Sequence, residues 1–241
     1  MSKFIDKLNS VSSGGLQPLG FRAAGAKPKP KMVLVAHVAA AAKAAVAGAD
    51  AVLMSIPKTG AKTPVKVAAD MPWGGWLKEV SAQGIKQLGE GGADFVVFPA
   101  ESVSKVVLEE EKLGKIVTVE PALDAGLLKA IDGLPVDAVL IAGEKSSLTW
   151  QDLMLFRRDA GILSKPLLAA VSPDITSSEL QALCEAGVAG VVVGGKLAGL
   201  RRMIDKLPAP KADKRRAEAL VPRMGGGAGV VSEEEEDDEE D

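Results

Sequence analysis

The sequence predicts an α/β protein whose parallel strands close into a (β/α)8 barrel, and three observations point to that fold class. Eight short apolar runs rich in β-branched residues occur along the chain, and most are separated by segments rich in Ala, Leu, Glu and Lys. A short motif recurs before every second run. The last run ends in two glycines and leads directly into a helical pattern. Strands that alternate with helices favour a parallel sheet, and eight strands are the number that a closed barrel needs.

The apolar runs give the predicted strands in chain order. They are Met32–His37, Ala51–Ile56, Met71–Leu77, Phe95–Phe98, Ile116–Val119, Ala138–Ala142, Leu167–Val171 and Val191–Val193. We expect helices over Trp76–Glu90, Glu101–Leu113, Asp124–Ile131, Thr149–Ala160, Ser177–Ala186 and Leu197–Leu207. The third run contains a proline and two glycines, which indicates a short strand with a bend. A doubly wound open sheet is the alternative fold, but no Gly-x-Gly-x-x-Gly motif follows the first run.

The recurring motif places an aspartate just before the second, fourth and sixth runs. Asp50, Asp94 and Asp137 are separated by 44 and 43 residues, and Gly187–Val192 resembles a fourth copy without the acid. A repeat of this length holds two βα units, so four copies make eight. Each aspartate lies in the turn that enters a strand. We therefore expect these aspartates at the N-terminal end of the barrel, where residues serve stability.

The two ends of the chain differ in composition from the predicted barrel, residues 32–207. Residues 1–31 predict an irregular arm after a short amphipathic helix near Phe4, Ile5 and Leu8. The arm could cap the bottom of the barrel or reach a neighbouring subunit. Residues 208–241 are first basic and then acidic, with too few apolar side chains to offset the cost of ordering, which predicts a disordered acidic tail.

Composition excludes several kinds of protein and site. With one cysteine, Cys184, and one histidine, His37, the chain has no internal disulfide and no Cys/His zinc cluster. No segment has the pattern of a signal peptide or the length of a membrane span, so we expect a cytoplasmic protein. Aromatic residues make up only 3% of the chain, which argues against nucleic-acid binding. We expect no cofactor.

In a barrel, functional groups lie where strands end and the following loops begin. Glu120 follows the fifth run, where apolar walls would raise its proton affinity and make it a general acid or base. His37 ends the first run and is the second acid–base candidate. For Glu120 the structural alternative is an ion pair or a helix cap, and for His37 it is a satisfied, half-buried ring.

Other polar residues at strand ends have weaker functional signals. Lys58 lies in a loop with three lysines, which could close over an anionic substrate. Glu101 and Glu144 could join Glu120 around a divalent ion, but a carboxylate that opens a helix favours the positive helix end without a metal, so no metal is predicted. No Gly-x-Ser-x-Gly elbow supports serine hydrolysis, and Cys184 is expected to pack in the core.

The segment Val171–Lys196 resembles the last quarter of the phosphate-binding (β/α)8 barrels, a group that includes thiamine-phosphate synthase and indole-glycerol-phosphate synthase. In that group a loop after the seventh strand and a glycine turn after the eighth grip the substrate phosphate. The resemblance implies phosphate-binding roles for Ser172, Gly194, Gly195 and Lys196. One departure is Ser172-Pro173-Asp174, which stands where the group commonly has a Gly-Gly-Ile type of turn.

These observations predict a barrel that binds a small anionic, phosphorylated metabolite at its C-terminal end, with Lys58 and Lys196 as charge partners. The reaction would be of the lyase, isomerase or synthase type. The alternative is a non-catalytic binding or scaffold barrel that acts through its arm and acidic tail. A homo-oligomer is possible.

Overall fold

The computed structural model describes residues 2–12, 31–38, 46–56, 71–102, 104–143, 147–195, 197 and 199–208. The chain divides into two units, Met1–Pro210 and Lys211–Asp241, and all of the described residues belong to the first. The predicted tail from residue 209 onward and most of the predicted irregular arm therefore lie outside the described residues. The predicted domain boundaries stay predictions.

Eight parallel strands form a closed barrel in the order of the sequence, which confirms the predicted fold class. The strands are β1 Val33–Val38, β2 Ala51–Ile56, β3 Trp73–Leu77, β4 Phe95–Pro99, β5 Gly114–Val119, β6 Ala138–Ile141, β7 Leu167–Val171 and β8 Gly190–Gly194. Pairing of β8 with β1 closes the barrel, so the alternative of an open sheet is wrong.

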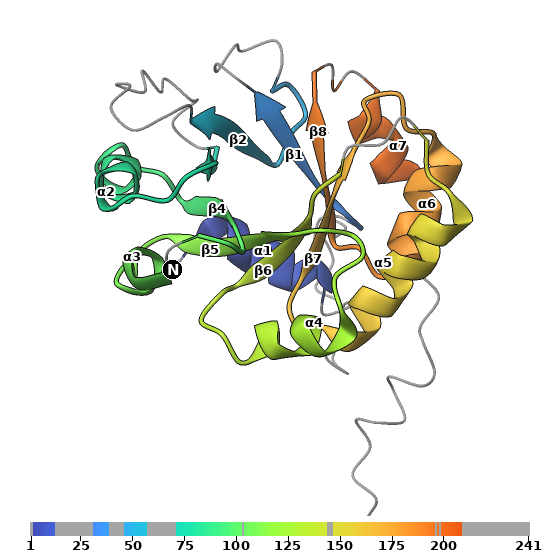
Figure 1. Cartoon of the computed structure of the whole chain (residues 1–241). Helices are drawn as coiled ribbons and strands as arrows, with labels where there is room; N and C mark the ends of the chain where they lie inside the picture. Colours follow the sequence, from blue (N-terminus) through green and yellow to red (C-terminus); the bar gives the residue numbers. More distant parts are fainter. Residues whose placement is uncertain are drawn as a thin grey trace, which may run out of the picture. The chain divides into compact units, whose positions relative to one another are not determined.

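All of the described helices except the first lie around the outside of the strands. The described helices are α1 Lys3–Ser12, α2 Ala82–Glu90, α3 Ser104–Leu108, α4 Ala125–Asp132, α5 Trp150–Ile162, α6 Ser177–Ala186 and α7 Leu200–Lys206. Figure 1 shows α2 to α7 around the outside and α1 near the middle. The helix expected over Glu101–Leu113 is much shorter, because three successive acidic residues, Glu109–Glu111, oppose the negative end of a helix.

The third strand keeps its two glycines because its neighbours leave no room for side chains. A Cβ at Gly74 would come within 2.4 Å of the Phe95 ring inside the barrel. On the outer face, a Cβ at Gly75 would come within 2.6 Å of Leu88 in α2. The glycines therefore fit a strand packed closely on both faces, rather than a break in the sheet.

Helix α1 packs into the N-terminal end of the barrel. Its buried side chains Phe4, Ile5 and Leu8 join the cluster that fills the barrel interior, and the Phe4 ring stacks on Phe95 with centroids 4.4 Å apart. The carboxylate of Asp94 accepts hydrogen bonds from Ser2 Oγ at 2.7 Å and from the N–H groups of residues 3 and 4 at 2.9 and 2.8 Å. The start of the predicted arm therefore caps the bottom of the barrel.

The repeated aspartates have the structural role that the sequence predicts. The Asp50 N–H donates a hydrogen bond to the Leu34 carbonyl on β1 at 2.7 Å, and the Leu34 N–H donates one to the Asp50 carboxylate at 2.9 Å. Asp137 does the same with Lys115 on β5, at 2.7 Å. These bonds fix the register between neighbouring strands at the N-terminal end of the barrel.

Candidate functional site

The C-terminal end of the barrel carries polar side chains in its uppermost interior layers. In an eight-stranded barrel, four side chains from alternate strands make up each layer. Following the strand register around the barrel gives one layer of His37, Trp76, Thr118 and Ala170, from β1, β3, β5 and β7. The layer above it consists of Ser55, Pro99, Ala142 and Gly194. Deeper layers are apolar, so only the C-terminal end is equipped for chemistry.

His37 is held by contacts on two neighbouring strands. Its Nε2 lies 2.7 Å from Ser55 Oγ on β2, a hydrogen bond that runs in either direction according to the tautomer. The ring lies 4.9 Å from the Trp76 indole on β3, centroid to centroid, with the planes tilted by 45°. All three side chains are half-buried. The imidazole is therefore oriented by the fold and still reachable from the mouth of the barrel.

The glycine turn after β8 lies directly beside this histidine. Gly194 pairs with His37 in the β1–β8 register. Gly195 is exposed and has a left-handed backbone with φ +83°, and a Cβ built there would meet no atom of the described residues within 4 Å. Among the hydrogen bonds of the described residues, none uses the Gly195 N–H. This turn thus offers open space and a backbone donor next to an imidazole.

The structure describes only two of the other predicted site residues, and it corrects the expectation for one of them. Glu120 is exposed, so the expected enclosure by apolar walls is wrong: it follows the last residue of β5 and stands on the rim. The Ser172 hydroxyl accepts a hydrogen bond from the Asp174 N–H at 3.4 Å, which holds the β7–α6 loop. Lys58 and Lys196 lie outside the described residues, as does Glu144.

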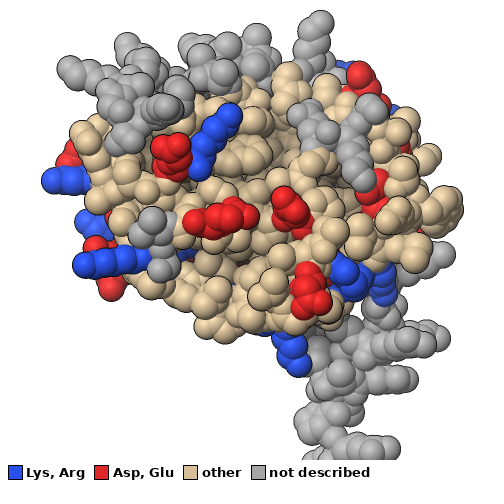
Figure 2. Space-filling model, in the orientation of Figure 1, with Lys and Arg blue, Asp and Glu red and all other residues tan. Residues whose placement is uncertain are grey.

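Exposed carboxylates are common near the described strand ends. Glu101, Glu120 and Asp174 are all exposed. Figure 2 shows acidic side chains over the middle of the face in view, with most of the basic ones toward its edges. No three His, Cys, Asp or Glu side chains of the described part of the chain are arranged to hold a metal ion. No helix within that same part is long and apolar enough to cross a membrane.

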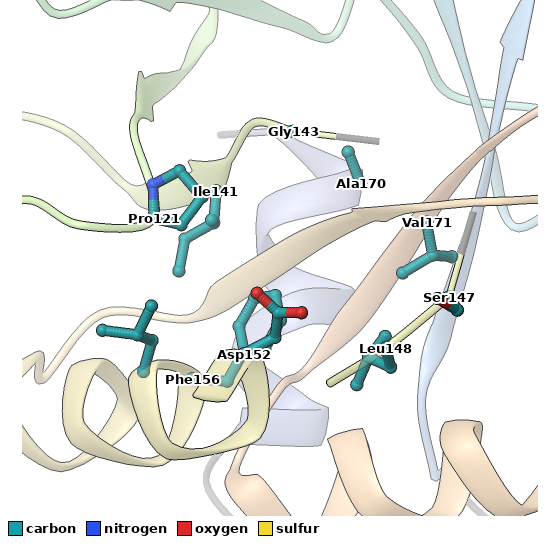
Figure 3. A pocket seen from close by; sticks show the side chains of 10 residues that line it. Pro121, Ile141, Gly143, Ser147, Leu148, Asp152, Phe156, Ala170 and Val171 are labelled. Atoms are coloured by element: carbon teal, nitrogen blue, oxygen red, sulfur yellow. The ribbon is translucent and has the colours of Figure 1, made fainter. Parts of the chain in front are cut away.

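A small cavity lies beside the mouth, between α5 and the ends of β6 and β7. Its volume is about 30 Å³, which is room for water rather than for a metabolite. Figure 3 shows the Asp152 carboxylate among apolar side chains that include Ile141 and Val171. Asp152 is 6% exposed and bonds to the N–H and hydroxyl of Thr149, which caps α5. This carboxylate therefore has a structural role at the start of the helix.

Two features of the site were missed by reading the sequence. The Ser55–His37 hydrogen bond joins residues of different strands, so it depends on the register between β1 and β2. Thr118 lies inside a strand rather than at its end, whereas polar residues at strand ends are the usual sequence signal for a barrel site. The spacing of two residues between Thr118 and Ile116 could have indicated that Thr118 faces the barrel interior, because alternate residues of a strand face the same side.

Comparison with known proteins supports the fold. No family model matches the sequence, and no curated protein matches it. A ligand-free tryptophan synthase from M. tuberculosis is similar in structure, with a TM-score of 0.55 and 15% identity, over 85% of this chain and 96% of that chain. A mutant tryptophan synthase alpha-subunit from Pyrococcus furiosus has a TM-score of 0.55 and 15% identity, over 78% of this chain and 97% of that chain. Phosphoribosyl anthranilate isomerase from Thermococcus kodakaraensis has a TM-score of 0.52 and 19% identity, over 72% of this chain and 95% of that chain.

The chain has the (β/α)8 barrel fold of these enzymes. At such identities the similarity concerns the fold, and function has to be argued from the site.

Proposed function

We propose that this barrel binds a small anionic, phosphorylated metabolite at its C-terminal end. One observation carries the proposal: the open turn at Gly194–Gly195, with a backbone N–H available, lies in register beside the only histidine of the chain. Backbone N–H groups in a glycine turn suit phosphate oxygens. Among the structurally similar proteins, the phosphoribosyl anthranilate isomerases are named for a phosphoribosyl substrate.

In this proposal the residues divide into two groups. Gly194, Gly195 and Lys196 hold the anion, together with Ser172 and Lys58. His37 and Glu120 exchange protons with the ligand, His37 from inside the mouth and Glu120 from the rim. A reaction of the lyase, isomerase or synthase type follows from acid–base groups of this kind. A cytoplasmic location and a homo-oligomer stay predictions from the sequence.

Thermal unfolding of the full chain tests the anion site. Because a ligand that binds only the folded state stabilises it, inorganic phosphate or pyrophosphate at a hundredfold excess over Kd should add about 2.7 kcal/mol. That is a rise in Tm of about 5 to 10 °C for a chain of this size. Gly195→Asp should abolish the rise, because its carboxylate would point into the open space that the anion needs.

Gly92→Asp is a matched control. Gly92 also has a left-handed backbone, with φ +75°, and open space where a Cβ would stand, but it lies in the turn between α2 and β4 at the opposite end of the barrel. Both variants should suffer similar backbone strain and gain the same charge. The proposal is contradicted if no anion raises the Tm of the unmodified chain, or if Gly92→Asp removes the effect as well.

A further inference from the structure

A buried hydroxyl without a partner lies inside the mouth of the barrel. Thr118 on β5 is 9% exposed, and its Oγ1 is the one buried side-chain polar atom of the described residues that has no hydrogen-bond partner. Burying a hydroxyl without a partner is unfavourable, and native proteins rarely leave such groups unsatisfied. An unsatisfied hydroxyl at the functional end of a barrel therefore calls for a reason.

The fold itself gives no reason for a hydroxyl here. The Thr118 carbonyl accepts a hydrogen bond from the Ala100 N–H at 3.2 Å, and the residue pairs with Pro99 and Leu140 on the adjacent strands. Valine has nearly the same shape and fits a buried strand equally well, as its neighbours Val117 and Val119 illustrate. The hydroxyl thus adds a polar group that the strand does not need.

The surroundings of Thr118 define what could pair with it. In the layer built from His37, Trp76, Thr118 and Ala170, His37 lies on the opposite strand of the barrel. Trp76 comes from β3, which lies between those two strands around the barrel, and its indole is 4.9 Å from the His37 ring. The next layer up contributes Ser55, Pro99, Ala142 and Gly194, so neither layer holds a carboxylate, a lysine or an arginine. The deep part of the mouth therefore suits a neutral group that can both donate and accept hydrogen bonds.

We propose that Thr118 is a ligand-binding residue that pairs with a neutral hydroxyl group of the metabolite, while the anionic group of the same ligand stays at Gly194–Gly195. This inference rests on the proposed function and adds a second, deeper contact to it. A hydroxyl that is satisfied only by the ligand favours ligands that carry the matching group.

Calorimetric titration of the full chain with two probes tests this assignment. Ribose 5-phosphate carries hydroxyl groups as well as a phosphate, whereas inorganic phosphate carries only the anion. We expect Thr118→Val to raise the Kd for ribose 5-phosphate about tenfold and to leave the Kd for inorganic phosphate within about twofold. Thr118→Ser, which keeps the hydroxyl, should retain ribose 5-phosphate binding.

The Tm of the same variants separates binding from folding. Thr118→Val should have a Tm equal to that of the unmodified chain or about 2 to 4 °C higher, because it removes an unsatisfied buried hydroxyl. Thr176→Val is the control: the Thr176 hydroxyl caps α6, so this change should lower the Tm and leave both Kd values unchanged. A fall in Tm for Thr118→Val would assign the hydroxyl to the fold and overturn the proposal.

The titrations also distinguish this inference from the function on which it rests. If neither probe binds the unmodified chain, both proposals fail. If inorganic phosphate binds at Gly195 but ribose 5-phosphate binds no more tightly, or if Thr118→Val weakens both probes equally, only the assignment of Thr118 fails.

Discussion

Three aspartates that look equivalent in the sequence have different partners in the folded chain. Asp137 bonds to one strand N–H, whereas Asp50 also pairs with Lys7 at 2.6 Å and Arg201 at 2.8 Å. The side chain of Asp94 bonds to the start of α1 instead. The sequence repeat predicts their common place at the N-terminal end. It cannot predict the different partners, because those residues lie up to 151 positions away in the chain.

Asp94→Ala should destabilise the fold more than Asp137→Ala does. It removes three hydrogen bonds that end on one carboxylate and leaves the first N–H groups of α1 without an acceptor, which should cost about 2 to 3 kcal/mol. Asp137→Ala, which removes one exposed bond, should cost about 1 kcal/mol. Urea unfolding of both variants measures the difference. Equal losses for the two would show that α1 adds little to the stability of the barrel.

At the scale of single elements, local sequence predicts α6 well and α3 poorly. Helix α6 occupies the predicted range Ser177–Ala186, because Thr176 and Glu179 form a capping box and Gly187 ends the helix in a left-handed conformation. The box is readable as a Thr-x-x-Glu pattern. Helix α3 has no such capping signal, and it ends at Leu108, just before Glu109–Glu111 and short of the predicted Leu113.

Glu179 makes the stability of α6 depend on pH. Hydrogen bonds from the backbone and the hydroxyl of Thr176 lower the pKa of the Glu179 carboxyl. Because the folded-state pKa lies below the unfolded one, this carboxylate stabilises the fold fully above about pH 4.3, and the gain is lost as the pH falls through the lowered folded-state pKa. Glu179→Ala should therefore cost about 1 kcal/mol at pH 7 and progressively less under acid conditions.

Urea unfolding between pH 7 and pH 3 measures this dependence. Glu185→Ala serves as the control on the same helix, since Glu185 is exposed near the negative helix end and bonds only to Gln181 through its side chain among the contacts described. It should change stability little at any pH. A Glu179→Ala loss of the same size at pH 3 as at pH 7 would contradict the role assigned to the capping box.

For the barrel as a whole, the order and number of the strands were predictable from the sequence. The polar layer of side chains inside its C-terminal end was not. Apolar runs and the recurring aspartate give the strand count, because each signal is local or repeats along the chain. The polar layer of His37, Trp76 and Thr118 is built by closure of the barrel, which brings β1, β3 and β5 around one axis. Glu120 shows the same limit, since its exposure depends on loops rather than on its own strand.

The central claim is that an anion binds at the turn after β8, beside His37. Amide chemical shifts of the 15N-labelled full chain, followed during titration with inorganic phosphate, test it most directly. The account predicts that the amides of Gly194 and Gly195 shift in a saturable manner together with that of His37, while the amide of Gly92 at the opposite end stays in place. Saturable shifts that leave Gly194 and Gly195 unmoved, or no shift anywhere, would contradict it.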